Sequence, residues 1–393
     1  MRKGWEYKKL GEVCCPKSKI QRATKCFGGS DEILYIDISS IDNSVQEVNS
    51  ITSFTMSNAP SRAQQKVEYG DIIVSTVRPN LKNVAFIKQH DSNLVVSSGF
   101  CVLRTTDDIE RNYLFRYITS DIFTQHLMKL TTGANYPAVR DLDVRDSTIP
   151  LPPKATQLAI VSELDKINEL IRLKKEQLKD FDNLAQSLFY EMFGDPVENE
   201  KGWEVKKLND ICDVRDGTHD SPKYLQNSEY ILITSKNIVN GSIDFENVNY
   251  ISEEDYIKIN KRSKVDNGDI IMPMIGTIGN PIIAHIDGTY KFCIKNVALI
   301  KFLADSTVNN MFIVNLMRCS SFSSYLLNQN KGGTQKFVAL GAIRKLPIPL
   351  PPLSLQRLFA QRIEQIEREK SEVQKSIQDL ETLLASRMQY WFE

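Results

Sequence analysis

The chain has 393 residues, of which 41% are hydrophobic, and its 49 basic side chains are balanced by 49 acidic ones. This length suits two ordinary domains with additional long helices, and the hydrophobic content excludes wholesale disorder. The zero net charge is unusual for a protein that binds nucleic acid unaided, and the lack of an apolar leader or an apolar run of about 18 residues predicts a cytoplasmic protein that does not span a membrane.

The chain opens with a basic segment that includes KGWEYKKLGEVC at 3–14. Its Trp, Leu, Val and Cys side chains are expected to be buried and its lysines to be solvated. The seven Cys residues include no C-x-x-C pair, which indicates reduced thiols. Cys14 is therefore predicted to be a small buried residue.

A β-hairpin is predicted at 69–87, YGDIIVSTVRPNLKNVAFI, because runs of β-branched residues flank a turn of Pro and Asn. The strand-like run ILYIDIS at 33–39 precedes the hairpin, and a helical stretch from Asn112 to Leu130 follows it. A glycine-bearing loop at 131–148 then leads into IPLPP at 149–153. This proline run indicates a rigid entry into a helix.

A 40-residue helix is predicted from Lys154 to Phe193, which contains neither Gly nor Pro. Apolar residues recur in it every 3.5 residues on average, as in a coiled coil, so the helix needs a partner. At 1.5 Å per residue it would be about 60 Å long. The repeating positions are Ile160, Leu164, Ile167, Ile171, Lys174, Leu178, Phe181, Ala185, Leu188 and Met192.

The second half of the chain repeats this order. KGWEVKKLNDIC at 201–212 is followed by a second hairpin at 267–286, a helical stretch, a glycine-bearing loop, IPLPP at 348–352, and a helix from Ser354 to Phe392. Two polar residues, Lys370 and Arg387, interrupt the second apolar stripe, and their stems are expected to lie along it with their heads in water. Residues 15–68 and 213–266, in contrast, show little likeness to each other.

The order of domain, helix, domain, helix with short connections predicts that the two helices run antiparallel. The end of the chain should then lie near its beginning, and the two halves should be related by a pseudo-two-fold axis. Such a scaffold suits duplex DNA, which is itself pseudo-two-fold. Similar framing segments around different middle segments are the pattern expected of one fold that reads two different half-sites.

These duplicated segments, with Gln157 or Gln356 following each IPLPP, resemble the specificity subunit of type I restriction–modification enzymes. The family often carries Glu-Gln after the prolines, whereas this chain has Thr-Gln and Leu-Gln, a departure that concerns only a local helix-start contact. The resemblance implies an α+β protein in which two similar α/β target recognition domains alternate with the two helices of an antiparallel coiled coil. The expected domains are residues 1–152 and 195–351, and the expected helices are residues 153–194 and 352–393.

The resemblance also implies the function. Each domain would read one half of a split, asymmetric double-stranded DNA sequence, and the helices would set the spacer and dock modification subunits. Those subunits would methylate adenine with S-adenosylmethionine, and restriction subunits would cleave DNA with ATP and Mg²⁺, so no cofactor or metal is expected in this chain. The sequence itself contains no N/D-P-P-Y/F run and no Gly-Lys pair, and its four His residues stand far apart.

Candidate DNA contacts come from the hairpin tips, the basic segment after Cys14, the middle segment of the second half and the glycine-bearing loops. Arg can bind guanine and Asn can bind adenine, so the tips either read bases or are simple turns. The first basic segment, a loop by its sequence, is expected to contact phosphates, and His219 is a turn or DNA-facing residue, with catalysis as an alternative. The candidates are Lys17, Lys19, Arg22, Lys25, Arg78, Asn80, Lys82, Tyr136, Arg140, His219, Lys223, Tyr224, Lys236, Asn237, Thr277, Asn280, Lys331, Gln335 and Lys336.

Two other classes of protein remain open on the sequence. One is an interaction scaffold that carries two binding domains on a coiled coil and binds no nucleic acid. The other is an enzyme that acts alone. The duplicated basic loops and the pseudo-symmetry favour the DNA-binding interpretation over both.

Overall fold

The computed structural model describes residues 4–133, 136–239, 241–276, 278–302, 306–328 and 337–393. The chain forms two compact units: Met1–Lys175 with Lys375–Glu393 make up unit 1, and Glu176–Gln374 make up unit 2. Both long helices, α6 (Lys154–Phe193) and α12 (Leu353–Phe392), contribute to both units. The first helix has the predicted ends, and the second begins one residue earlier than predicted.

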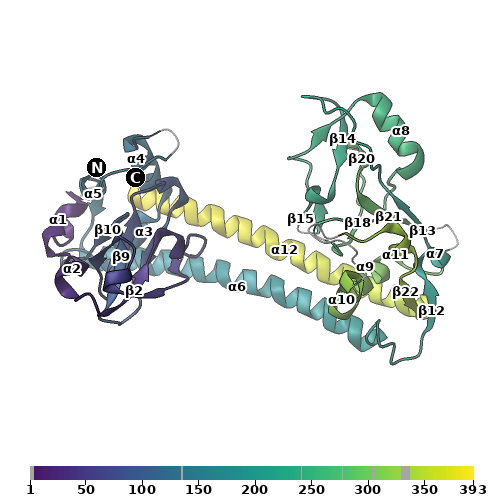
Figure 1. Cartoon of the computed structure of the whole chain (residues 1–393), viewed down its shortest axis with the longest axis horizontal. Coiled ribbons are helices and arrows are strands. Elements are labelled where there is room, and N and C mark those ends of the chain that lie inside the picture. Colours follow the sequence, from purple (N-terminus) through teal and green to yellow (C-terminus); the bar gives the residue numbers. More distant parts are fainter. Residues whose placement is uncertain (1–3, 134–135, 240, 277, 303–305, 329–336) are drawn as a thin grey trace. The chain divides into compact units, whose positions relative to one another are not determined.

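The centre of unit 1 is a three-stranded sheet built around the predicted hairpin (Figure 1). Strand β7 (Ile72–Ser75) pairs with β8 (Val84–Phe86) on one side and with β10 (Phe100–Leu103) on the other, both antiparallel. Successive side chains point to opposite faces. Ile72 and Val74 therefore join a core with helices α3 (Arg111–Ile118) and α4 (Asp121–Leu130), whereas Ile73 joins a core with a second sheet.

This second, outer sheet has the order β5-β2-β9-β6, in which β2 and β9 run parallel. Its inner face, with Ile36 and Val96, packs on the hairpin sheet. Its outer face, with Ile33 and Val95, packs with Ala23 of the short helix α2 (Ala23–Cys26). The strands are β2 (Glu32–Ile36), β5 (Thr52–Thr55), β6 (Ala63–Lys66) and β9 (Leu94–Ser97).

Unit 2 repeats these layers. Its hairpin sheet has the order β13-β21-β18-β19, and its outer sheet has the order β17-β14-β20, again with a parallel pair, β14 and β20. The outer face is covered by the 11-residue helix α8 (Glu253–Ser263) through Ile259. The strands are β13 (Asp213–Asp216), β14 (Tyr230–Ile233), β17 (Asn249–Tyr250), β18 (Ile270–Pro273), β19 (Ile282–Ile283), β20 (Lys291–Ile294) and β21 (Val297–Lys301).

Shorter elements complete the two units. In unit 1 they are β1 (Glu6–Lys9), α1 (Leu10–Val13), η1 (Lys17–Lys19), η2 (Ile38–Ser40), β3 (Ile41–Asp42), β4 (Glu47–Val48), η3 (Met56–Asn58), η4 (Pro79–Leu81), α5 (Asp141–Arg145) and β11 (Thr148–Leu151). In unit 2 they are β12 (Glu204–Lys207), α7 (Leu208–Ile211), η5 (Ser235–Asn237), β15 (Ile238–Val239), β16 (Ser242–Ile243), α9 (Asn310–Arg318), α10 (Ser320–Asn328), α11 (Leu340–Arg344) and β22 (Pro347–Leu350).

The two long helices pair antiparallel within each unit, as predicted. In unit 1 the start of α6 shares a core with the end of α12, and Lys175 pairs with Glu381 at 2.8 Å. In unit 2 the Phe359 ring near the start of α12 contacts Phe189 and Phe193 near the end of α6, with centroids 5.6 and 5.3 Å apart. These two phenylalanines are more deeply buried than the predicted positions beside them, so the apolar stripe shifts by one residue at this end.

The two polar residues of the second stripe are ion-paired across the helices, which corrects the expectation that their heads would simply lie in water. Lys370 Nζ lies 2.8 Å from Asp182 Oδ1, and Arg387 Nη2 lies 3.1 Å from Glu163 Oε2. The bond from Arg387 lowers the pKa of the Glu163 carboxyl. Each pair joins α12 to α6, so the polar positions link the helices without breaking the seam.

A buried glutamine fixes the start of each long helix. Gln157 donates to Pro152 O at 2.8 Å and accepts from the Glu110 N–H at 2.7 Å. Gln356 donates to Pro351 O at 2.8 Å and accepts from the Asn309 N–H at 2.9 Å. The proline runs themselves form the strands β11 and β22, which pair with β1 and β12. The predicted rigid entry is thus a strand followed by a hydrogen-bonded helix start.

The beginning of the chain meets its end, as predicted. The rings of Trp5 and Trp391 are parallel, with centroids 6.2 Å apart. All seven Cys residues are free thiols. Cys14 and Cys212 are buried at equivalent positions, and burial raises the pKa of each thiol to about 12. Both are therefore inert packing residues.

Candidate nucleic-acid interface

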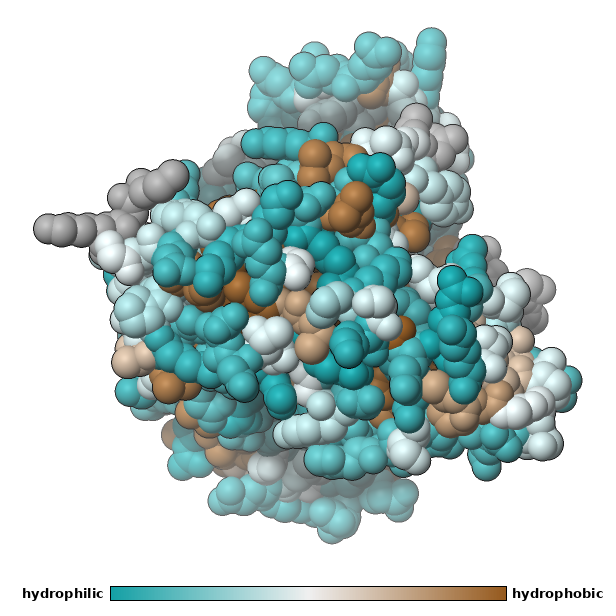
Figure 2. All heavy atoms as spheres, turned by 90° about the vertical axis from the view of Figure 1, so that its left-hand side faces the viewer, coloured by the Kyte–Doolittle hydropathy of each residue, from teal (hydrophilic) through white to brown (hydrophobic). Residues whose placement is uncertain are grey.

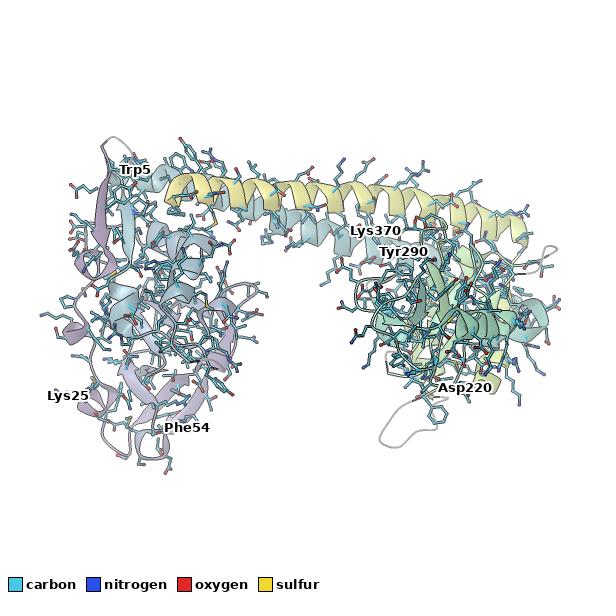
Figure 3. The ribbon with its side chains drawn as sticks, turned by 90° about the horizontal axis from the view of Figure 1, so that it is seen from above. Trp5, Lys25, Phe54, Asp220, Tyr290 and Lys370 are labelled. Carbon is cyan, nitrogen blue, oxygen red and sulfur yellow. The ribbon has the colours of Figure 1, made fainter. Side chains whose placement is uncertain are left out.

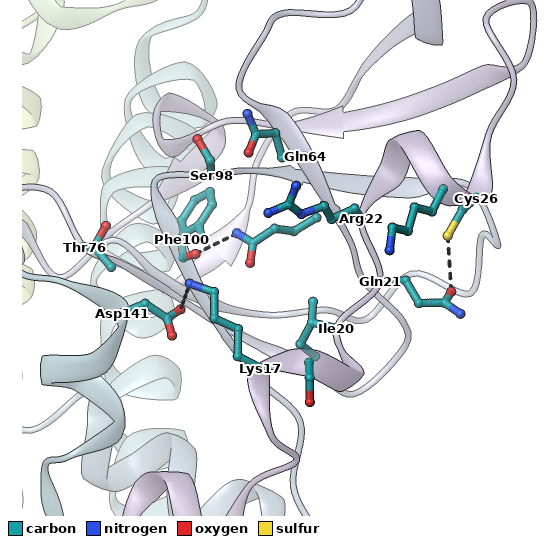
Figure 4. A pocket seen from close by; sticks show the side chains of 13 residues that line it. Lys17, Ile20, Gln21, Arg22, Cys26, Gln64, Thr76, Ser98, Phe100 and Asp141 are labelled. Carbon is teal, nitrogen blue, oxygen red and sulfur yellow. Dashed lines mark hydrogen bonds and ion pairs between the residues drawn. The ribbon is translucent and has the colours of Figure 1, made fainter.

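The basic segment of unit 1 is folded, which corrects the expectation of a loop. It forms the turn η1 and the helix α2, whose Ala23 is anchored in the outer core. Lys17, Arg22 and Lys25 line a pocket of about 670 Å³, called the basic pocket below (Figure 4). Gln21, Gln64 and Ser98 add amide and hydroxyl groups to its lining. Lys19 is exposed but lies outside this lining.

The basic pocket carries an excess of positive charge. Lys17 Nζ lies 3.4 Å from Asp141 Oδ1, the one carboxylate in the lining. Among the described residues, the side chains of Arg22 and Lys25 have no hydrogen-bonding or ion-pairing partner. Positive groups without an internal partner on an exposed surface suit an anionic ligand such as a DNA backbone.

The hairpin tip of unit 1 is joined to the glycine-bearing loop. The Arg78 guanidinium lies over the Tyr136 ring at 4.4 Å, and the Arg78 N–H donates to Pro137 O at 2.7 Å. Arg78 has a left-handed backbone conformation with φ of 50°, which costs energy for a residue other than glycine. Asn80 is exposed beside it. The structure therefore brings Tyr136 to Arg78 and Asn80 of the hairpin tip, from which it is distant in sequence.

Two other candidates of unit 1 are held by ion pairs. Lys82 Nζ lies 2.6 Å from Asp121 Oδ1 at the start of α4, so this lysine fastens the hairpin to the helix. Arg140 Nη2 lies 2.6 Å from Asp143 Oδ1, and hydrogen bonds from Arg140 lower the pKa of that carboxyl. The Arg140 side chain is nevertheless 78% exposed. Arg140 remains accessible to a ligand, whereas Lys82 is largely committed to the fold.

In unit 2, His219 belongs to a cluster formed by Asp216, His219, Ser221, Arg262, Lys295 and Asn296, called the His219 cluster below. Its Nε2 lies 2.8 Å from Asp216 Oδ2, and its Nδ1 lies 2.9 Å from Asn296 Oδ1. These hydrogen bonds, to Asn296 first and then to Asp216, raise the pKa of the imidazole. With both ring nitrogens facing oxygens, the imidazolium form is favoured and no lone pair is left for general-base catalysis.

The remaining candidates of unit 2 are divided between several places. Asn237 is only 3% exposed, and its carboxamide accepts from the Thr234 N–H and donates to Asn247 O, so its amide is used within its turn. Asn280 lines a cleft with Asp182 and Lys370 of the long helices, away from the His219 cluster. Lys223, Tyr224 and Lys236 are exposed. Thr277, Lys331, Gln335 and Lys336 lie outside the described residues.

Two arginines outside the list of candidates, Arg145 and Arg344, serve the fold. Arg344 donates to Val214 O at 2.8 Å, and Arg145 donates to Cys15 O at 3.0 Å in unit 1. Each arginine thereby holds the backbone where the variable middle segment begins. The positive charge of an arginine in the sequence does not show whether it bonds the backbone in this way or contacts DNA.

Sequence reasoning missed five polar residues at these surfaces. Gln21, Gln64 and Ser98 line the basic pocket, and Arg262 and Lys295 belong to the His219 cluster. Arg262 lies on a charged helix, where a cation is ordinarily a solvated residue, and the others show no local pattern. These five residues can be recognised only by comparing equivalent positions of the two units, and that comparison requires the strand topology.

Part of each middle segment lies on the side of its unit away from the long helices, whereas Ile238 and Gly241 of the unit 2 segment line the cleft beside those helices. In unit 1, Figure 3 shows Lys25 and Phe54 at this edge, and in unit 2 it shows Asp220, next to His219, at the corresponding edge. The face of unit 1 seen in Figure 2 is mostly hydrophilic, with hydrophobic residues in small separate groups. Such a surface suits a polar, charged ligand better than an apolar one.

Two other kinds of site receive no support. Among the residues that the structure describes, no group of His, Cys, Asp and Glu side chains is arranged to hold a metal ion. No helix in the described part of the chain is long and apolar enough to cross a membrane. Each unit instead presents hydrogen-bond donors and positively charged side chains on a polar surface. The chain thus belongs to the class of proteins with two similar α/β domains, each carrying positive charge on a polar surface.

Comparison with known proteins identifies the family. The model of the type I restriction modification DNA specificity domain matches this chain twice, at residues 2–180 and 200–382. The chain belongs to this family. Two copies of a DNA specificity domain fit the recognition of a DNA target in two parts, one by each domain, and the fold class inferred from the sequence is confirmed.

Individual relatives agree with this assignment. The type I restriction enzyme MjaIX specificity subunit of Methanocaldococcus jannaschii is 26% identical over 312 residues, covering 73% of this chain and 68% of the relative. A chain from a solved type I R-M system is 25% identical with a TM-score of 0.68, covering 99% of this chain and 97% of the other. The S subunit of a type I restriction-modification system from M. genitalium shares the fold at 12% identity, with a TM-score of 0.52 and coverage of 99% and 96%.

Proposed function

We propose that this chain is the non-catalytic DNA-recognition subunit of a type I restriction–modification complex. Unit 1 reads one half-site of an asymmetric double-stranded target, and unit 2 reads the other. The observation that carries the proposal is the double match to a DNA specificity domain, together with the different polar clusters that the two units present in the same layer of the fold. Family membership excludes the scaffold alternative.

The partners follow from the same assignment. Modification subunits, which use S-adenosylmethionine, dock on this chain and methylate adenine in the two half-sites. Restriction subunits, which use ATP and Mg²⁺, cleave DNA. The chain itself supplies binding groups: Arg22, Lys25 and Arg78 in unit 1, and the exposed Lys223 and Lys236 in unit 2.

Methyl transfer tests this proposal directly. The purified chain should incorporate no labelled methyl groups into DNA, whereas a complex with its modification subunits should label one bipartite sequence. The DNA affinity of the chain alone should be weak and should fall with salt, because a protein of zero net charge neutralises few phosphates. Methylation by the isolated chain, or labelling of a single continuous sequence by the complex, would contradict the proposal.

The long helices are proposed to set the spacer between the half-sites. One heptad inserted after Lys174 and one after Val373 keeps both apolar stripes in register and lengthens each helix by roughly 10 Å. That length corresponds to about three base pairs of DNA, with a rotation of nearly a third of a turn. The variant should select a longer spacer from a library of spacer lengths, or methylate every spacer poorly. Full activity on the original spacer would show that the helices do not set it.

A further inference from the structure

The basic pocket of unit 1 and the His219 cluster of unit 2 occupy the same place in the fold. Ser98 directly follows β9, and Lys295 directly follows β20, each in the turn that leads into the hairpin sheet. Gln64 lies in β6 beside β9, and Arg262 lies in α8, which packs on β20 through the bond from Asn260 to Phe292 O. Where unit 1 has a hydroxyl and an amide, unit 2 therefore has two cations.

Lys295 is the more unusual of these cations because it is only 8% exposed. Its Nζ donates to Ser221 Oγ at 2.7 Å. An ammonium group has three donors, and within the described part of the chain it makes no other hydrogen bond or ion pair. Leaving donors of a buried charge unpaired is costly. A ligand that brings acceptors to this ammonium would relieve that cost.

The backbone around Lys295 is fixed. The Lys295 N–H donates to Ile233 O at 2.8 Å, and the Thr218 N–H donates to Ile294 O at 3.0 Å. Asn296, the next residue, has a positive φ of 56° and bonds the His219 ring. The backbone that carries Lys295 is thus fixed in this turn, and the ammonium itself is held by Ser221.

The groups around Lys295 leave the site positively charged. Asp216, a buried carboxylate, is shared by Arg262 and His219. The Arg262 side chain is 64% exposed and extends from the same cluster. One carboxylate is therefore set against the two cations Arg262 and Lys295, an arrangement that favours a ligand rich in hydrogen-bond acceptors.

We propose that Lys295, together with Arg262, recognises a guanine in the half-site that unit 2 reads. Guanine presents two acceptors, O6 and N7, in the major groove, and Arg and Lys are the side chains that most often bind them. A base contact is favoured over a phosphate contact because Lys295 is fixed and buried, whereas the exposed Lys223 and Lys236 suit the backbone. This inference rests on the proposed function and attributes the recognition of one base in the unit 2 half-site to two side chains.

The test uses the complex of this chain with its modification subunits and a DNA library in which the unit 2 half-site is randomised. Lys295→Met should reduce discrimination for guanine at one position about tenfold to a hundredfold, without affecting the other half-site. Lys291→Met is the matched control, since Lys291 lies in β20, is exposed and pairs with Glu229 at 2.8 Å. This control should keep the original sequence preference.

Each outcome decides the proposal. An unchanged preference with Lys295→Met, or a uniform loss of methylation with a smaller salt dependence and no change of preference, would overturn the guanine contact. If Lys295→Met does not fold, Lys295→Gln serves instead, because an amide should shift the preference from guanine toward adenine. Failure of the unaltered complex to methylate any bipartite sequence would instead refute the proposed function.

Discussion

The two units share an inner frame and differ in their outer layer. In both, a GDII strand starts the hairpin sheet, a buried aspartate pairs with a cation, and a buried glutamine fixes the helix start. Outside this frame, unit 1 has the four-residue helix α2 and strand β6, whereas unit 2 has the 11-residue helix α8. The comparison teaches that the shared inner frame holds the fold together, whereas the outer layer is free to differ between the units.

The buried ion pair illustrates how the frame tolerates substitution. Asp71 accepts two hydrogen bonds from Arg104, at 2.8 Å each, and Asp269 accepts one from Lys301 at 2.6 Å. Each carboxylate also accepts from the backbone, Asp71 from the Glu68 N–H and Asp269 from the Asp266 N–H. The aspartate can therefore pair with an arginine in unit 1 and with a lysine in unit 2, because its hydrogen bond to the backbone is the same in both units.

The largest expected effect concerns the aromatic core of unit 2, where α12 begins. Phe359→Ala should lower the free energy of unfolding by about 3–5 kcal/mol, because it removes the ring that contacts Phe189 and Phe193. Ile160→Ala, at the equivalent position of α6 in unit 1, should cost less, since a smaller side chain is lost. Hydrogen exchange in each unit under increasing denaturant measures both changes in the free energy of unfolding. A larger loss of stability for Ile160→Ala than for Phe359→Ala would contradict this prediction.

The glutamines at the helix starts should be equivalent. Gln157→Ala and Gln356→Ala each leave a buried N–H and a carbonyl unpaired, which should cost about 1–3 kcal/mol of stability in either unit. Gln365→Ala on the exposed face of α12 is the control and should change stability by less than about 0.5 kcal/mol. Clearly unequal costs for the two buried glutamines would show that the two frames are not alike.

The hairpin tips should differ between the units. Changing Arg78 and Asn80 together to Ala should cost roughly 1–3 kcal/mol of discrimination in the half-site read by unit 1 and leave the other half-site intact. Asn280→Ala should alter neither half-site, because Asn280 faces the long helices. Methylation mapping of the assembled complex measures both, and simultaneous change of the two half-sites would refute modular reading.

The smallest expected effect is the pH dependence of stability that His219 of unit 2 contributes near neutral pH. Because bonds to Asn296 and Asp216 raise the pKa of His219, its protonated form stabilises the folded unit. That contribution is fully present below the unfolded pKa of about 6.5 and is lost as pH rises through the higher folded value. Melting temperatures of the chain and of His219→Gln should therefore converge with rising pH, and divergence would contradict the assignment.

Much of the fold follows from local sequence. The long helices were predictable because a 3.5-residue apolar period over 40 residues has one physical solution, a helix paired along its stripe. The hairpins were predictable because β-branched runs and turn residues are local signals. The repeat itself predicted that the helices are antiparallel and that the chain ends meet, as the Trp5–Trp391 contact confirms.

The sites were decided by tertiary structure. Asn237 was a candidate DNA contact from its place in the middle segment, yet its turn buries it, and Arg78 contacts Tyr136 only because the hairpin and the loop converge. Lys295 and Ser221 are 74 residues apart, and Arg262 and Asp216 are 46 apart. Composition and periodicity report only on residues that are close along the chain. Strand pairing and helix packing, in contrast, bring these distant residues into contact. The sequence by itself therefore determined the frame, and only the fold determined which side chains share a surface.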